Sequence, residues 1–203
     1  MLLIFKKFSG FTLIEVLVSL GIFILFITVA ALFISTIFSS NNIIYNQLTA
    51  QKEARRVAAD FVKELRNASA SSIGSYMVAE ATPTSFAFYS DIDSDSYAEK
   101  VRYFVSGSLF KKGVIKPSGN PLSYNDSTEV ITGVVHDLTA DQQPFSYFNK
   151  NYTGLGSALS FPINVLDVRM VQMSLVIDQK PGLSPLPITI NAKAEIRNLK
   201  YAE

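Results

Sequence analysis

An acidic side chain stands inside the most apolar stretch of this 203-residue chain. Glu15 directly precedes an apolar run from Val16 to Phe38, and no further charged residue follows before Lys52. A carboxylate at the centre of a membrane helix costs about 2.5–3.5 kcal/mol on insertion scales and less near an end, so it usually marks a function. The chemistry open to such a carboxylate is ion pairing with a cation that neutralises it.

A second acidic group has the spacing of metal ligands. Asp91, Asp93 and Asp95 occupy every second position, and Glu99 follows four residues later. Oxygen ligands at positions one, three and five begin a calcium loop of the EF-hand type, where they converge on the ion. The spacing therefore makes Asp91, Asp93 and Asp95 candidate calcium ligands, with Glu99 at position nine.

The same segment departs from the calcium-loop pattern at two positions. Position six is Ser96 where the pattern has glycine, and position twelve is Arg102 where it has glutamate. Two interpretations stay open. The segment is a calcium site, or it is an acidic, solvated turn between two strands.

Little else in the chain offers catalytic chemistry. The absence of cysteine excludes disulfides, thiolate metal sites and a cysteine nucleophile. His136 is the only histidine, and nothing beside it in the sequence identifies a catalytic triad. A net charge of +1 gives no basic patch for nucleic acid. We therefore expect no enzymatic activity, no nucleic-acid partner and no cofactor apart from calcium.

The apolar run is long enough to cross a bilayer as a helix, which takes about 20 residues. A secretory signal peptide would carry a small-residue cleavage site after its apolar core. Here Lys6, Lys7 and the small pair Ser9-Gly10 all precede the run, and no such site follows closely. A plain single-pass anchor fits the length but gives no reason for Glu15.

At Lys6–Glu15 the chain resembles the type IV pilin superfamily, which includes the pseudopilins of type II secretion. The matching features are a basic leader, a glycine before an aromatic residue, and a glutamate five positions after that glycine. The resemblance implies that a prepilin peptidase cuts between Gly10 and Phe11 and methylates the new amine of Phe11. It also implies that Glu15 pairs with the amine of a neighbouring subunit during filament assembly.

The elements that would carry this segment divide the chain into three parts. Residues 1–10 form the leader, and 11–74 are expected to form one long helix whose part 11–44 lies in the membrane. In the second half of that helix Ala54, Ala58, Phe61 and Leu65 recur at helical spacing on one face. We expect this stripe to pack on the protein's own sheet, with a partner-helix seam as the alternative.

Residues 75–203 are predicted to form a β-rich globular domain. Alternating apolar residues predict strands at Ser85–Ser90, Lys100–Ser106, Ser108–Lys116, Phe145–Asn149, Val165–Asp178 and Ile188–Arg197. Ser106-Gly107 is expected to turn a hairpin, and the Pro181–Pro187 loop to join the last two strands. Helical spacing of the apolar residues in Thr128–Leu138 predicts a short helix.

A long helix followed by alternating strands predicts an α+β fold, with the helix packed on an antiparallel sheet. This is the fold that the pilin resemblance implies. The layout of hairpins, a short helix near Thr128 and two final long strands is similar to the J-type minor pseudopilin of type II secretion.

The expected function is that of a minor pilin or pseudopilin, a structural subunit of a type IV pilus or type II secretion filament. Its expected partners are the prepilin peptidase, other subunits through the N-terminal helix, and the inner membrane, with the globular domain outside the cytoplasm. The alternatives are an adhesive or ligand-binding tip pilin, and a plain single-pass membrane-anchored domain.

Overall fold

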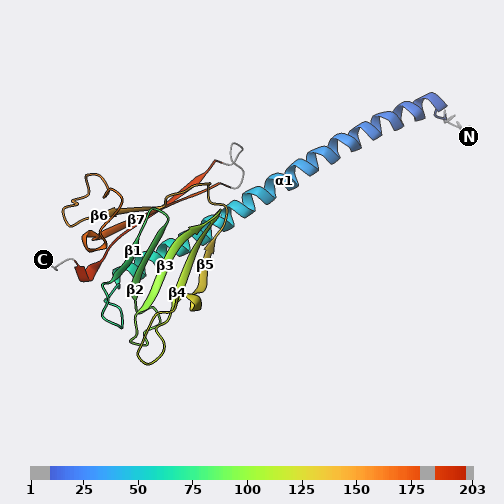
Figure 1. The fold of residues 1–203 in the computed structure, drawn as a ribbon. Coiled ribbons are helices and arrows are strands. Elements are labelled where there is room, and N and C mark those ends of the chain that lie inside the picture. The colour runs from blue at the N-terminus through green and yellow to red at the C-terminus, as the bar shows by residue number, and fades with distance from the viewer. Residues whose placement is uncertain (1–9, 179–185, 200–203) are drawn as a thin grey trace, which may run out of the picture. The chain divides into compact units, whose positions relative to one another are not determined.

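The computed structural model describes residues 10–178 and 186–199 (Figure 1). Contacts divide the chain into two units, one ending at Ile44 and the other beginning at Tyr45. The first unit is helix alone after its N-terminal residues, and the second holds the end of that helix and all the strands. The leader residues 1–9 lie outside the described part of the chain.

Helix α1 (Leu13–Arg66) contains residues of both units. It ends at Arg66, earlier than the predicted end at residue 74, because the following backbone finds other partners. The amides of Asn67 and Ala68 bond carbonyls three residues back, which closes the last turn, and the Ser69 amide donates to Tyr89 in the sheet at 2.9 Å. Pairing with the sheet therefore replaces the next helical turn.

The first sheet is an antiparallel meander in the order β1-β2-β3-β4-β5 (Figure 1). Its strands are β1 (Val78–Ala81), β2 (Ser85–Ser90), β3 (Glu99–Ser106), β4 (Leu109–Ile115) and β5 (Val130–Val135). The predicted strands at β2, β3 and β4 are confirmed, and β1 was not predicted. Ser106 pairs with Leu109, and Gly107 turns the hairpin with φ +63°.

The predicted helix over Thr128–Leu138 is wrong. A single 3-10 turn, η1 (Asp126–Thr128), precedes strand β5, which pairs with β4. Four of the six residues of β5 are β-branched valine or isoleucine, which favours a strand. A bulge at Lys112/Gly113 shifts the pairing register and disturbs the alternation that would have revealed the strand. The side chain of Glu129 crosses so close to Gly113 that a β-carbon there would lie 2.1 Å from its Oε1 atom.

The second sheet has the order β6-β7-β8 and is also antiparallel, with β6 (Phe145–Phe148), β7 (Met170–Ile177) and β8 (Ile188–Glu195). The predicted hairpin of the last two strands is confirmed. Short 3-10 turns η2 (Val165–Asp167) and η3 (Arg197–Leu199) flank it, so the predicted strand from Val165 begins later, at Met170. Most of the predicted Pro181–Pro187 loop lies outside the described residues.

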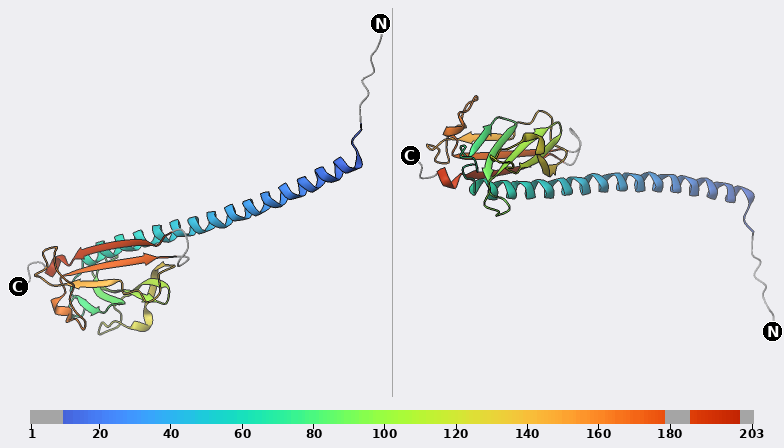
Figure 2. Two further views of the ribbon diagram at one scale, coloured as in Figure 1. Left: turned by 90° about the horizontal axis from the view of Figure 1, so that it is seen from above. Right: turned by 60° about the horizontal axis from the view of Figure 1, so that its bottom comes forward.

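The core of the second unit lies between the last turns of α1 and the two sheets (Figure 2). Phe61 of α1 packs edge-on against Tyr103 of the first sheet at 5.3 Å between ring centroids. It also packs against Phe145 of the second sheet at 6.4 Å. The predicted stripe on α1 is buried, as are Val171, Met173, Leu175 and Ile177 on β7. This is the predicted α+β architecture of a long N-terminal helix on antiparallel sheet.

An ion pair crosses this core. Glu64 of α1 accepts a hydrogen bond from Tyr103 Oη at 2.7 Å and one from Lys112 Nζ of β4. Burial and the neighbouring Glu64 carboxylate raise the pKa of Tyr103, so that residue stays a neutral donor. The network joins α1 to two strands of the first sheet.

Candidate processing and assembly site

The start of α1 is built around two side chains that cap each other. The Thr12 amide and hydroxyl each donate to Glu15 Oε2 at 2.9 Å, and the Glu15 amide donates to Thr12 Oγ1 at 3.3 Å. This reciprocal pattern is a capping box, which satisfies amides that a helix N-terminus leaves without partners. The spacing Thr12-x-x-Glu15 is the sequence signature of that box, so the pair could have been predicted.

The capping box gives Glu15 a partner within its own chain. Both Thr12 donors reach one carboxylate oxygen, and a carboxylate offers about four lone-pair sites in total. The positive end of the helix dipole also favours a negative charge in the first turn. The side chain is exposed, so a cation from outside the chain can still approach it.

The predicted cleavage position lies in the chain just before the helix. Gly10, Phe11 and Thr12 have no regular secondary structure, and Phe11 is 86% exposed. The Gly10–Phe11 peptide bond, where cleavage is predicted, is therefore accessible and non-helical. The structure places the predicted methylation residue, Phe11, directly before the capping box.

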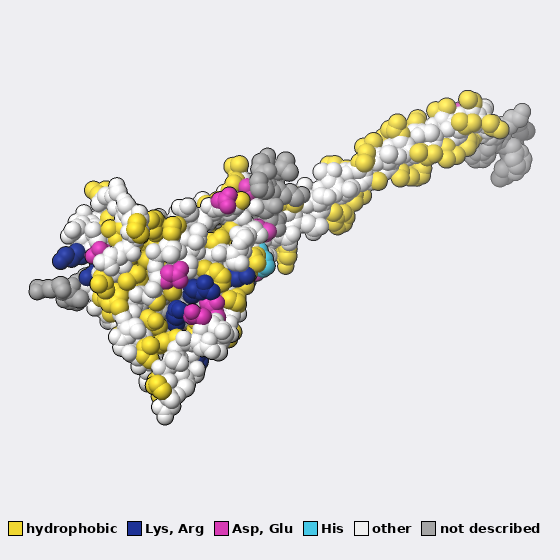
Figure 3. All heavy atoms as spheres, viewed as in Figure 1, with side chains coloured by type: hydrophobic (Ala, Val, Ile, Leu, Met, Phe, Trp, Pro, Cys, Tyr) yellow, Lys and Arg dark blue, Asp and Glu magenta, His cyan; other side chains and the backbone are white. Residues whose placement is uncertain are grey.

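The surface of α1 in the first unit is largely apolar and is exposed among the described residues (Figure 3). Residues 13–42 are all exposed, and they include most of the exposed large hydrophobic side chains. The hydroxyls of Ser19, Thr28, Thr36 and Ser39 each donate to the carbonyl four residues back. Polar groups satisfied within the helix need no water, which suits a lipid environment. Among the described residues α1 is the one helix long and apolar enough to span a membrane.

Residues 5–31 match the family model of the prokaryotic N-terminal methylation motif. The match gives the chain the prepilin-type N-terminus of the type IV pilin superfamily. The motif indicates a prepilin-type protein that is processed by prepilin peptidase, and it implies assembly with other pilin subunits. Its N-terminal helix anchors it by a single pass in the inner membrane, with a globular domain and a later filament state. No curated protein matches the chain.

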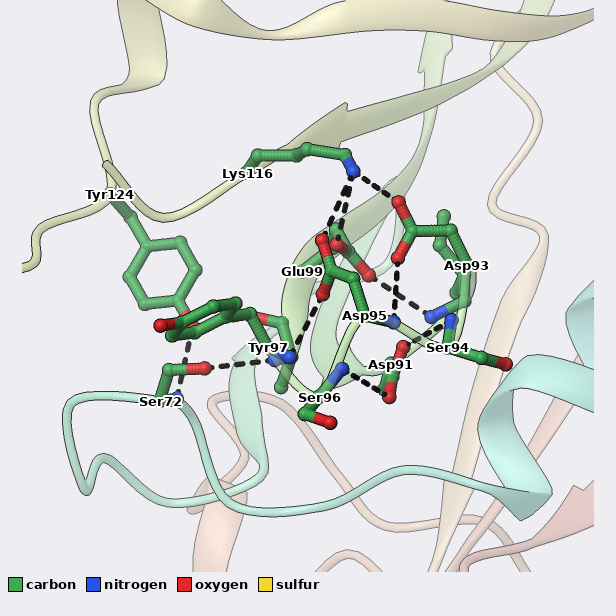
Figure 4. A network of polar contacts seen from close by, with 12 residues as sticks. Ser72, Asp91, Asp93, Ser94, Asp95, Ser96, Tyr97, Glu99, Lys116 and Tyr124 are labelled. Carbon is green, nitrogen blue, oxygen red and sulfur yellow. Dashed lines mark hydrogen bonds and ion pairs between the residues drawn. The ribbon is translucent and has the colours of Figure 1, made fainter.

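In the globular part of this pilin the acidic segment forms the connection between β2 and β3 (Figure 4). Carboxylate oxygens of Asp91, Asp93 and Glu99 lie within 4.8 Å of one another. Asp95 does not belong to that group, so the structure brings together two of the three predicted ligands. The third carboxylate of the group belongs to Glu99, the first residue of β3.

Lys116 joins this cluster from the end of β4. Its ammonium forms an ion pair with Asp93 and lies 3.4 Å from Asp95 Oδ2 and 3.9 Å from Glu99 Oε1. Nothing next to the loop in the sequence points to Lys116. The register of the predicted hairpin could have done so, because Lys100 pairs with Ile115, which sets Lys116 opposite Glu99.

The pKa values in the cluster shift in opposite directions. The hydrogen bond from Lys116 lowers the pKa of Asp93 and raises the pKa of Lys116 itself. Burial raises the pKa of Glu99, and the charges of Asp93 and Asp95 add to that rise. The surroundings of Glu99 therefore disfavour its charged form.

His136 follows the end of β5 and is exposed.

Proposed function

We propose that this protein is a minor pilin or pseudopilin, a structural subunit that joins or primes a membrane-anchored filament after its leader is removed. The observation that carries the proposal is the start of α1. There the Glu15 carboxylate caps the helix, stays accessible and lies next to the predicted processing position. The apolar surface of the helix in the first unit is exposed among the described residues. Such a helix is stabilised by lipid before assembly and by other helices afterwards.

Cleavage after Gly10 would make the Phe11 amine a new cation at the helix start. In a filament, Glu15 of one subunit would receive the amine of a neighbour, while the Thr12 bonds occupy only one carboxylate oxygen. Charge-assisted hydrogen bonds of this kind are stronger than neutral ones, and more so where water is excluded. The pairing would also set the axial register between neighbouring helices.

The proposed role is structural, and we propose no enzymatic activity. The filament is a type IV pilus or a type II secretion filament. The long helix, the hairpins and the two final strands support the similarity to the J-type minor pseudopilin of type II secretion. The predicted short helix near Thr128, which contributed to that similarity, is strand β5. The J-type assignment therefore rests on the other elements.

The test of this proposal is Glu15→Ala. We expect the leader to be removed as in the wild type, because the peptidase acts at Gly10–Phe11. We expect the amount of protein recovered in sheared filaments to fall at least about tenfold, because losing one partner of a buried pair leaves the other unpaired. Glu53→Ala, the same substitution further along α1, is the matched control and should assemble normally. Wild-type incorporation of Glu15→Ala would refute the assembly role.

A further inference from the structure

Glu99 stands out among the acidic side chains of the globular domain because it is fully buried, with 0% exposure. Its Oε2 atom accepts a hydrogen bond from the Ile92 amide at 3.0 Å. Its Oε1 atom is also buried and has no hydrogen-bond donor among the described residues. The ammonium of Lys116, 3.9 Å away, is beyond hydrogen-bonding distance. A buried carboxylate oxygen in this state is expensive unless a cation reaches it.

The surroundings of Glu99 are poor in positive charge. Asp91, Asp93 and Asp95 lie on the adjoining loop, and Lys116 is the one cation that the described residues bring against them. A single ammonium therefore serves several carboxylates, and it contacts Asp93 more closely than Glu99. Figure 4 shows Lys116 reaching over the loop from above the carboxylates. A divalent cation would neutralise this group better than one lysine can.

The loop backbone removes one objection to a calcium site that the sequence raised. Ser96, at the position where the EF-hand pattern has glycine, has φ +74°, the left-handed conformation that favours glycine. The second departure from the calcium-loop pattern remains. Arg102 on β3 donates from its Nε atom to Glu129 Oε1 at 2.8 Å, so it is not a substitute ligand. Glu99, at position nine, would supply the carboxylate that the pattern has at position twelve.

We propose that Asp91, Asp93 and Glu99 form a calcium site in which Lys116 holds the place of the ion until calcium displaces it. The ligands are all oxygen atoms, from an irregular loop and a strand end, and calcium accepts six to eight oxygens in flexible geometry. Water and backbone carbonyls complete such a shell in known calcium loops. Magnesium demands a stricter octahedron, and zinc prefers nitrogen and sulfur, which the site lacks.

Lys116 is suited to leave. Its side chain is 58% exposed, and its ammonium is a compact charge on a flexible four-carbon stem. The rival interpretation makes Lys116 a permanent ion-pair partner that closes an acidic turn, and the two interpretations predict opposite effects when Lys116 is replaced.

The experiment uses the full chain in detergent micelles, stripped of divalent ions with a chelator and then titrated with calcium. We expect saturable binding by calorimetry and a rise in Tm with calcium. Terbium, a luminescent substitute for calcium, should emit through excitation of Tyr97, which lies in the same loop. Tyr97→Phe should lower the emission and leave calcium binding unchanged.

Three substitutions separate the interpretations. Glu99→Gln should weaken calcium binding at least about tenfold while the calcium-free Tm does not fall, because glutamine can still accept the Ile92 amide and removes the buried charge. Asp126→Asn is the matched control: Asp126 is also an ion-paired acid, bonded to Lys100 at 2.8 Å, but lies outside the cluster. It should bind calcium as the wild type does.

Lys116→Gln decides the proposal. Removing the competing positive charge should tighten calcium binding by about tenfold. If Lys116 is only a structural partner, Lys116→Gln lowers the Tm and neither it nor the wild type binds calcium, which overturns the proposal. The result is independent of the pilin assignment, since leader removal and filament incorporation are measured separately.

Discussion

Gly10→Val chains coexpressed with a prepilin peptidase should keep Met1, whereas wild-type chains should begin at Phe11. The expected effect is close to complete, because the peptidase must accommodate residue 10 at the bond it cuts and a branched side chain blocks that approach. Intact mass and N-terminal sequencing measure it directly, since the two products differ by the ten-residue leader, residues 1–10.

The structure makes this a test of recognition rather than of folding. A β-carbon placed at Gly10 meets no atom within 4 Å, so the substitution does not strain the chain itself. Gly21 is equally open, which makes Gly21→Ala the control: it should be processed like the wild type. A wild-type chain that still begins at Met1 in the presence of active peptidase would contradict the assigned processing site.

Glu64→Ala should lower the free energy of unfolding of the globular unit by about 3–5 kcal/mol. Glu64 and Lys112 form an ion pair in which each side chain is 11% exposed. Removing the carboxylate leaves the Lys112 ammonium buried without its partner, and the Tyr103 hydroxyl also loses its acceptor. Urea unfolding of the full chain in detergent, followed by tyrosine fluorescence, measures the loss.

The double variant Glu64→Leu, Lys112→Met distinguishes a costly unpaired charge from a favourable pair. We expect it to recover most of the stability, because replacing both members of a buried pair with apolar residues is often neutral or stabilising. Asp126→Ala breaks an exposed pair as control and should cost less than about 1 kcal/mol. A loss below about 1 kcal/mol for Glu64→Ala would show that water reaches the pair.

Elements with a clear apolar period could be predicted from the sequence. On β8, Ile190, Ala192 and Ala194 alternate with polar residues, and all three are buried. The stripe on the second half of α1 has helical spacing and packs into the core. In both cases one face of the element meets the core, so the sequence repeats with the period of the element.

Elements whose pattern depends on their neighbours could not be predicted. In β5, Val130 and Ile131 are both exposed, and the bulge against β4 spoils the alternation that identifies a strand. Strand β1 is only Val78–Ala81, too short for a period to show. The division of the strands between two sheets likewise follows from which strand edges pair, which is a long-range property.

The sequence by itself predicted the processing segment and the membrane helix, and the spacing of Thr12 and Glu15 could also have predicted the capping box. These features lie within neighbouring residues of one segment, and a peptidase or a bilayer acts on that segment directly. Strand register could have placed Lys116 opposite Glu99, but only the tertiary structure decided that its ammonium pairs with Asp93 and that Glu64 pairs with Lys112. Such contacts depend on strand register and on the packing of α1 against the sheet, which bring together charges that lie far apart along the chain.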